Sequence, residues 1–267
     1  MLKDMTLGQY FPGNSVIHKL DPRVKIVSVI FYIAAVFSAS GTYSYILIAL
    51  CPILFVLLSG INVGTVMKSV KPLAFIICFT AVINLFWTTG DKLLFSLWII
   101  KVYAEGVATA LKMIVRLLTL VIGTFVLLTY TTSPVALTDA IEYLISPLKK
   151  LGVPTHEFSM MMSIALRFIP TLIEETDKII SAQKSRGANF EEGSLIKRSK
   201  ALIPVLIPLF VSAFRRADEL ACAMECRLYH GGEGRTKLKV FKMKPKDYAA
   251  LLLFVLLLAA VIILNMV

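Results

Sequence analysis

The sequence predicts an all-α membrane protein with about five transmembrane helices and a cytoplasmic set of three helices. Three observations lead to this prediction. The chain is 57% hydrophobic with a mean hydropathy of +0.79, which is more than a soluble core needs. Its charged residues lie in short, mainly basic stretches between long uncharged ones. Its central region contains apolar runs that are interrupted by proline and too short to cross a bilayer.

Each apolar stretch near the length of a membrane crossing, about 17–25 residues, is assigned as a span. The first follows Asp21-Pro22, a pair typical of an N-cap and the first helical position. A shorter stretch, Leu93–Ile100, is expected to lie at the far interface. The expected spans are Val24–Ala39, Tyr43–Ser59, Pro72–Trp87, Ala104–Tyr130 and Tyr248–Val267. The expected domains are therefore residues 1–130 with four spans, a cytoplasmic region 131–247 and a final span 248–267.

Lys and Arg residues in the short loops determine the expected orientation. Residues 1–25 are basic, and the loop between the second and third spans carries Lys68 and Lys71. The opposite loops carry only Lys92 and Lys101. Because basic loops remain in the cytoplasm, we expect the N-terminus and the central region inside and the C-terminus outside. The same bias explains the net charge of +11, and without a nucleic-acid motif we expect no nucleic-acid partner.

Two cations, Lys112 and Arg116, interrupt the fourth span one turn apart on one helical face. Charged side chains inside a bilayer are costly, so they should face the helix bundle or a watery cavity, or extend to the bilayer surface. A structural role for this pair is favoured over a role in transport.

The cytoplasmic region is expected to form three helices. The first starts at Ser133-Pro134 and ends before Gly152. The second covers Pro154–Arg186 and the third covers Leu195–Tyr229. The last two contain apolar runs of about 14 residues, too short for a bilayer core of roughly 30 Å. These runs must be buried against the membrane face, each other or another protein.

The last two of these helices contain a repeat. Residues 174–187 superimpose without a gap on residues 215–228, at an offset of 41 positions. A single Arg in a last helical turn would be an ordinary helix stop, because it interacts favourably with the helix dipole. Two matched ends in one chain favour a shared function. The aligned pairs are Asp177 with Asp218, Ala182 with Ala223, and Arg186 with Arg227.

The two helix ends carry related motifs, Ser185-Arg186-Gly187 and Cys226-Arg227-Leu228. They resemble the paired X-Arg-X motifs of the transmembrane T component (EcfT/CbiQ family) of energy-coupling factor (ECF) transporters. The second motif departs from the family's common Ala-Arg-Gly but keeps the Arg. The resemblance covers essentially the whole chain, in further blocks that follow the family's order: His18–Arg23, Thr131–Pro134, Leu166–Pro170 and Arg215–Glu219.

The resemblance implies a non-catalytic coupling subunit of an ECF-type ABC importer. Such a subunit transmits the ATP-driven motion of two ABC-type ATPase subunits to a small, membrane-embedded, substrate-binding S component. That component takes up a micronutrient, either a vitamin or a metal ion, and several exchangeable S components can share one coupling subunit. The resemblance also implies that ATP and Mg are bound by the partner ATPases, with no cofactor in this chain, and places the protein in the plasma membrane of a prokaryote.

The resemblance assigns roles to particular residues. The expected ATPase-binding residues are Ser185, Arg186, Gly187, Cys226, Arg227 and Leu228. The S component is expected on exposed apolar surfaces, including a Met cluster, because thioether side chains repack around different partners. The residues expected there are Met160, Met161, Met162, Leu206 and Phe210.

The aligned segments also suggest how the two Arg-tipped helices cross. At one shared level the first helix carries an acidic pair and the second carries a basic pair, and small residues beyond them would allow the backbones to approach closely. The alternative is that each charge pairs with a residue four positions along its own helix, which would position nothing. The expected crossing residues are Glu174, Glu175, Ala182, Arg215, Arg216 and Ala223.

Enzymatic chemistry is not expected of this chain. His156-Glu157 lacks the second His of a zincin, and the sequence contains neither a phosphate-binding glycine loop nor a nucleophile elbow. Cys222, Cys226 and His230 recur every four residues, but no fourth ligand is evident, so no metal site is expected.

The alternative function is a stand-alone membrane channel or carrier. Such proteins usually show polar residues along a path or broken spans at the middle of the membrane. Asn84, Lys112 and Arg116 are the candidates for such a path. A scaffold that couples cytoplasmic motors to another membrane protein fits the sequence better.

Overall fold

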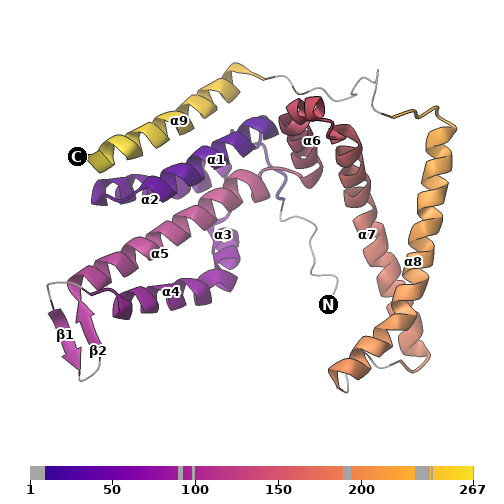
Figure 1. The fold of residues 1–267 in the computed structure, drawn as a ribbon, viewed down its shortest axis with the longest axis horizontal. Helices are drawn as coiled ribbons and strands as arrows, with labels where there is room; N and C mark the ends of the chain where they lie inside the picture. Colours follow the sequence, from indigo (N-terminus) through magenta and orange to yellow (C-terminus); the bar gives the residue numbers. More distant parts are fainter. Residues whose placement is uncertain are drawn as a thin grey trace. The chain divides into compact units, whose positions relative to one another are not determined.

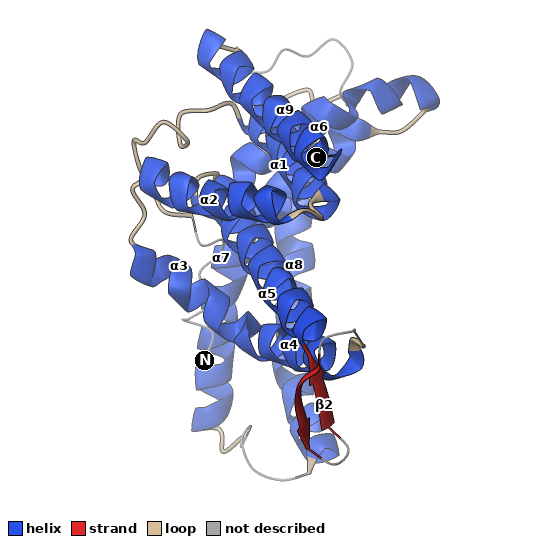
Figure 2. Cartoon of the chain, turned by 90° about the vertical axis from the view of Figure 1, so that its left-hand side faces the viewer, coloured by secondary structure: helices blue, strands red, loops and turns tan. Residues whose placement is uncertain are grey.

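The computed structural model of the chain describes residues 10–89, 93–97, 100–188, 190, 194–231, 241 and 243–266 (Figure 1). Most of these residues are helical, which confirms the predicted all-α class (Figure 2). Contacts divide the chain into two compact units. The first unit comprises Gly8–Ala140 with Val240–Val267, and the second contains Ile141–Lys239. Which residues face the cytoplasm stays a prediction.

The first unit contains the apolar helices. They are α1 (Pro22–Ser38), α2 (Thr42–Ser59), α3 (Val63–Val70), α4 (Ala74–Trp87), α5 (Ala104–Thr124) and α9 (Pro245–Met266). A π-helical segment, Phe125–Tyr130, extends α5. At 17 residues, α1 lies at the short end of the range for a crossing. Among the described residues, four helical stretches are long and apolar enough to cross a membrane: Thr42–Ser59, Val63–Trp87, Ala104–Tyr130 and Pro245–Met266.

The third expected span, Pro72–Trp87, begins earlier than predicted. Asn62 caps α3, because its side chain accepts a hydrogen bond from the N–H of Gly64 at 2.9 Å. A 3-10 turn, Lys71–Leu73, then joins α3 to α4. Pro72 lies in this turn and lacks an N–H, so it distorts the helix rather than starting it.

The stretch expected at the far interface forms part of an antiparallel hairpin. Its strands are β1 (Leu93–Leu97) and β2 (Ile100–Tyr103), with Leu97 opposite Ile100. The sequence here is rich in β-branched and aromatic residues, which favour strands. This hairpin is a small addition to an otherwise helical fold.

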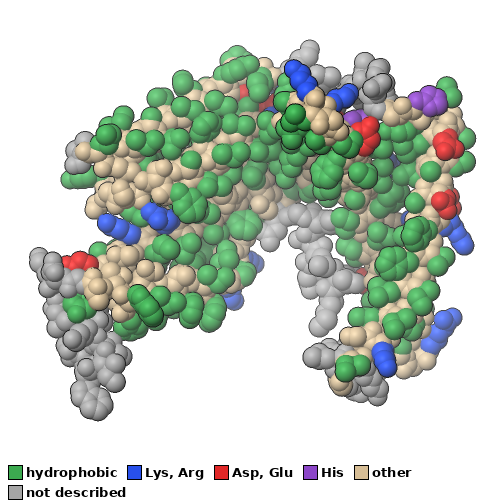
Figure 3. Space-filling view, viewed as in Figure 1, with side chains coloured by type: hydrophobic (Ala, Val, Ile, Leu, Met, Phe, Trp, Pro, Cys, Tyr) green, Lys and Arg blue, Asp and Glu red, His purple; other side chains and the backbone are tan. Residues whose placement is uncertain are grey.

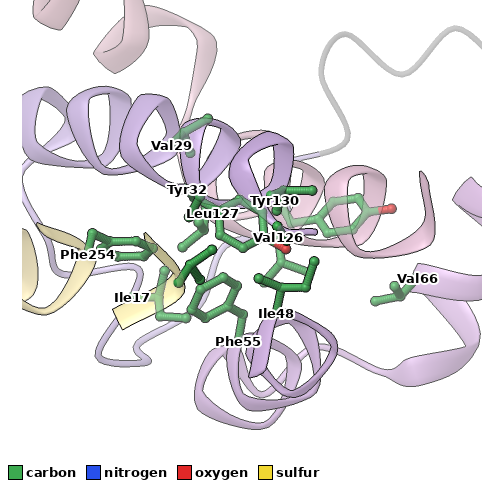
Figure 4. Packing of buried hydrophobic residues seen from close by; sticks show 14 residues of the cluster. Ile17, Val29, Tyr32, Ile48, Phe55, Val66, Val126, Leu127, Tyr130 and Phe254 are labelled. Carbon is green, nitrogen blue, oxygen red and sulfur yellow. The ribbon is translucent and has the colours of Figure 1, made fainter. Parts of the chain in front are cut away.

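The core of the first unit lies among α1, α2, α5 and α9 (Figure 4). Tyr32 of α1 is fully buried, and its hydroxyl donates to the carbonyl of Thr119 on α5 at 2.7 Å. The ring of Phe55 on α2 packs against Tyr32 and against Phe254 of α9, with centroid separations of 5.5 Å and 5.6 Å. Gly123 lets α5 lie against Tyr32, because a Cβ at this position would overlap the ring.

Charged residues join the start of α1 to its neighbours. Asp21 caps the helix as predicted: it accepts from the N–H of Arg23 at 2.9 Å and forms an ion pair with its guanidinium at 2.7 Å. Burial raises the pKa of Asp21, but the hydrogen bonds from Arg23 outweigh it and lower the pKa below its ordinary value. Buried Lys25 donates to the carbonyl of Thr131 at 2.8 Å and to the hydroxyl of Thr132 at 3.1 Å. These contacts connect α1 to the segment that follows α5.

The second unit contains two long helices, α7 (Thr155–Ser185) and α8 (Leu195–Glu225). Before them, α6 (Pro134–Ile145), whose residues up to Ala140 belong to the first unit, continues into a 3-10 segment, Ser146–Leu151. That segment ends at Gly152, whose φ of 82° is favoured in glycine, so the predicted stop is confirmed.

Candidate functional site

Helices α7 and α8 cross each other in the second unit (Figure 1). Two interhelical hydrogen bonds define their register: Arg216 donates to Glu175 at 2.7 Å, and Gln183 donates to the carbonyl of Pro204 at 3.4 Å. A later residue of α7 is therefore bound to an earlier residue of α8, which means that the two helices run antiparallel. The carbonyl of Pro204 is available because Pro208, four residues later, has no N–H to donate.

The ion pair between Glu175 and Arg216 is partly exposed, with side-chain exposures of 22% and 34% for the carboxylate and the guanidinium. A hydrogen bond from Ser212 and the neighbouring Arg216 charge lower the pKa of Glu175 below its ordinary value, although desolvation opposes them. Glu175 is therefore ionised near neutral pH. Its partner lies 41 positions away, which is the offset of the sequence repeat.

The ion pair joins equivalent positions of the two repeats. Where two antiparallel helices meet at equivalent residues, they are related by an approximate two-fold axis through the contact. The predicted pairing between the acidic residues of α7 and the basic residues of α8 is therefore formed by Glu175 and Arg216. Glu174 and Arg215 take no part in this bond. Among the described residues, no ion pair joins positions four apart within α7 or α8.

The small residues expected at the crossing do not meet each other. Ala182 and Ala223 each lie seven residues beyond the ion pair, and both are exposed. Because the helices are antiparallel, the two alanines lie on opposite sides of the contact. The interhelical hydrogen bonds lie at Glu175–Arg216 and at Gln183–Pro204 instead.

Both helices end with the same backbone pattern. After α7, the N–H of Ala188 donates to the carbonyl five residues earlier at 3.0 Å, and after α8 the N–H of Tyr229 does the same, also at 3.0 Å. The preceding residues have positive φ, 87° at Gly187 and 55° at Leu228. This pattern is a Schellman-type helix end. The sequence repeat is therefore also a repeat of backbone geometry, despite the departure at the second motif.

Leu228 is the only non-glycine residue with positive φ among the described residues. Its side chain is 77% exposed, so little burial offsets a conformation that costs an L-residue about 1 kcal/mol. Replacing Leu228 with Gly should therefore stabilise the end of α8 by about that amount. Hydrogen exchange at the amide of Tyr229 should slow about fivefold. Gly187→Leu should destabilise the end of α7 and speed exchange there. Unchanged hydrogen exchange in both variants would contradict a strained backbone at Leu228.

Arg186 is the C-cap residue of α7, and Arg227 directly follows Cys226, the C-cap residue of α8. Both side chains are exposed, and in the described part of the chain neither guanidinium makes a hydrogen bond or an ion pair. Each Arg lies 11 residues after its member of the central ion pair, about 16 Å along its helix and in opposite directions. The crossed helices thus present two unpartnered guanidinium groups, one at each end. The neighbouring motif residues, also exposed, are Ser185, Gly187, Cys226 and Leu228.

An apolar pocket of about 240 Å³ lies beside the ion pair. Phe168 and Leu172 line it from α7, and Leu220 and Met224 line it from α8. Packed interiors contain few voids larger than a water molecule. The facing side chains of α7 and α8 therefore leave an unfilled space on this side of the ion pair.

The residues expected to bind the S component lie in two separate places. Met161 and Met162, near the start of α7, are 57% and 41% exposed, and Met160 is half-buried. Leu206 and Phe210, on α8, are 46% and 61% exposed. The antiparallel register separates the two groups by roughly 30 Å along the helix pair. They do not form one patch.

The exposed apolar surface of α8 is larger than the sequence analysis named. Its apolar run was recognised, but which of its residues remain exposed depends on the packing against α7. Hydrophobic side chains cover much of the visible surface of these helices (Figure 3). The further exposed residues are Leu202, Ile203, Ile207, Val211 and Phe214.

Comparisons with known proteins give a consistent result. The family model CbiQ, described as a cobalt transport protein, matches residues 13–238. The energy-coupling factor transporter transmembrane protein EcfT of Clostridium kluyveri is 51% identical over 94% of this chain and 93% of its own length. The chain belongs to the EcfT family. The EcfT proteins of Ruminiclostridium cellulolyticum and Bacillus subtilis are 52% and 43% identical, over 92% and 97% of this chain and the same shares of their own lengths.

Family membership confirms the resemblance stated from the sequence. The chain is the T component of an ECF transporter, and its coupling role follows from the family. With four candidate spans in its described residues, it is a multi-pass protein of the cell membrane. The matched range includes the ion pair and both Arg motifs.

Proposed function

We propose that α7 and α8 are the coupling elements of this EcfT-family chain, and that they transmit the ATP-driven motion of two ATPase subunits to a separate S component. The observation that carries the proposal is the arrangement of Arg186 and Arg227. Both are exposed, and they lie at equal distances along the helices from the Glu175–Arg216 contact.

The chemistry of the two tips suits docking. A guanidinium offers a planar set of donors that matches a carboxylate or the carbonyl groups at a helix end. Two tips related by an approximate two-fold axis match a pair of similar subunits that are themselves related in this way. Each tip ends a 31-residue helix, so a displacement at the tip moves the crossing as well.

The catalytic part of the cycle belongs to the partners in this proposal. ATP and Mg are held by the two ATPase subunits, and this chain performs no chemistry. It passes on the movement through the crossing of α7 and α8, where the apolar pocket provides room for the helices to shift.

The exposed apolar residues support the proposal of an S-component partner. Phe210 and Phe214 on α8 are 61% and 68% exposed, which is costly unless a membrane or a protein covers them. The S component would select the vitamin or metal ion that is transported. The Met residues at the start of α7 would suit exchangeable partners, because their side chains repack readily.

Two of the three polar residues that would line a channel, Asn84 and Arg116, are bound to backbone carbonyls instead. Asn84 donates to the carbonyl of Thr80 at 2.8 Å within α4. Arg116 donates to the carbonyl of Ala39 at 2.6 Å. Because these side chains are bound to carbonyl groups of the protein, they are less available to a passing solute. This favours a coupling role over a stand-alone channel or carrier.

Co-purification tests the proposal. An affinity-tagged chain expressed in its native cell should retain two ATPase subunits and a small apolar membrane protein, identified by mass spectrometry. A homo-oligomer that conducts solute after reconstitution, with no ATPase bound, would contradict the proposal and favour a channel.

The expected orientation is tested separately. With the four native cysteines replaced, a single cysteine at Gly187 should react with a membrane-impermeant maleimide only after the cells are opened. The basic loops retain the N-terminus and the coupling helices in the cytoplasm, which is the physical reason for this result. Labelling of Gly187→Cys in intact cells would contradict both the orientation and the docking.

A further inference from the structure

Lys112 and Arg116 of α5 lie where other helices end. Arg116 donates to the carbonyl of Ala39, the C-cap residue of α1, at 2.6 Å. Asn265, near the end of α9, accepts hydrogen bonds at 3.1 Å from two backbone N–H groups of the turn between α1 and α2. Hydrocarbon offers no partners to the polar backbone groups of helix ends, so such ends belong at the bilayer surface. These two cations therefore lie near the lipid headgroups rather than at the middle of the membrane.

The two cations share one aromatic ring. The ammonium nitrogen of Lys112 lies 5.8 Å from the ring centroid of Tyr45, and the guanidinium carbon of Arg116 lies 5.4 Å from it. Like charges one turn apart on a helix repel each other. The ring partly offsets this repulsion, but it carries no negative charge that could neutralise the pair.

No carboxylate neutralises this cluster in the described part of the chain, where neither cation takes part in an ion pair. The nearest acid before the pair on α5 is Glu105, seven residues before Lys112 and about 10 Å away along the axis. Arg116 therefore makes one hydrogen bond, to a carbonyl, and Lys112 makes none among the described groups.

The cluster also has unused hydrogen-bond donors. The Nε of Arg116 is buried without a partner, and the hydroxyl of Tyr45 makes no hydrogen bond within the described structure. Both cations and Tyr45 are only half-buried, so a ligand can reach them. An anion with several acceptor oxygens would satisfy these groups and neutralise the charge.

We propose that Lys112, Arg116 and Tyr45 form a binding site for the phosphate group of an anionic phospholipid in the leaflet at this end of α1. Phosphate oxygens accept several charge-assisted hydrogen bonds, and guanidinium matches their geometry well. Basic pockets between transmembrane helices on the cytoplasmic side of membranes bind anionic headgroups through the same chemistry. A lipid at this site would contact α2 and α5 together, next to the end of α1.

Lipid binding to the purified full-length chain in detergent tests the site. Phosphatidylglycerol and phosphatidylcholine with identical acyl chains are compared by native mass spectrometry, and wild type should prefer phosphatidylglycerol. Lys112→Gln should reduce this preference about fivefold, and Lys112→Gln with Arg116→Gln should reduce it on the order of twentyfold. Lys112→Arg should retain it, because the charge remains.

A matched control removes the same charge elsewhere. Lys68→Gln with Lys71→Gln, at the junction of α3 and α4, should leave the preference unchanged. Arg116→Gln could unfold the chain by removing the bond to Ala39. In that case the comparison of Lys112→Gln with Lys112→Arg still tests whether the charge at position 112 binds the lipid. The site is refuted if Lys112→Gln binds phosphatidylglycerol like wild type, or if the control loses as much. Complete displacement of the lipid by equimolar inorganic phosphate would identify a free anion as the ligand and overturn the lipid assignment.

Discussion

Replacing Arg186 and Arg227 together with Glu should abolish ATPase association and substrate uptake. Each tip is exposed and unpartnered in the described chain, so its guanidinium is available to a partner. Loss of a charge-assisted pair that becomes buried on docking typically costs about 2–5 kcal/mol, and reversal of the charge adds repulsion. Two such losses should reduce association more than a thousandfold. The amount of ATPase retained by the tagged chain and the uptake rate in cells measure this effect.

Lys149→Glu with Lys150→Glu is the matched control. These residues are exposed in the same unit and undergo the same change in charge, but they lie outside the two motifs. The control should assemble and transport normally. Membrane insertion should be unchanged in both double variants. Wild-type uptake by the Arg186→Glu, Arg227→Glu variant would mean that the two arginines are only helix stops.

Reversing one charge of the Glu175–Arg216 pair should weaken assembly, and reversing both should restore it. Either Glu175→Arg or Arg216→Glu places like charges where the structure has a contact of 2.7 Å. An exposed pair contributes only about 0.2–1 kcal/mol to stability, but like charges in contact would change the crossing and the positions of both tips. Each single variant should lose ATPase association roughly fivefold or more, and the double variant should recover most of it.

The neighbouring positions provide the control for this exchange. Glu174→Arg with Arg215→Glu makes the same substitutions one residue away, where the structure has no interhelical bond. This pair should show no rescue, because its effects should simply add. Rescue at both pairs, or at neither, would contradict a helix contact that depends specifically on Glu175 and Arg216.

The acid sensitivity of the pair follows from the pKa of Glu175, which is lowered from its ordinary value of 4.5. A group with a lowered folded-state pKa contributes its full stabilisation above its ordinary pKa and loses it as pH falls through the folded value. The crossing should therefore be insensitive to pH near neutrality.

The sequence predicted the coupling helices well because their ends are encoded locally. Gly187 and Gly152 mark positions that need positive φ, and Arg186 and Arg227 align without a gap. It also predicted which charges could meet. It could not show that Glu175 and Arg216 meet while the flanking pair does not, because that choice depends on the antiparallel register of the two helices.

Other features depended on contacts between distant segments. The start of α3 was missed because its cap, Asn62, lies in a loop with no strong apolar signal after it. For Arg116 the sequence left open the bundle, a watery cavity and the bilayer surface, since its position in the sequence gives no indication that α1 ends beside it at Ala39. The second motif departs from the family's common form at Leu228, and the sequence did not show that the hydrogen bonds of the Schellman-type turn maintain the geometry there.

Site-specific photo-cross-linking from the two helix ends tests the central claim most directly. A photoreactive amino acid is placed at Gly187 or at Leu228 in the full chain, expressed in its native cell, and cross-linked partners are identified by mass spectrometry. Docking predicts that each position cross-links to an ATPase subunit, and that Arg186→Glu or Arg227→Glu removes the product at its own tip. Cross-links from both positions to lipid or to a second copy of this chain, with no ATPase product, would contradict it.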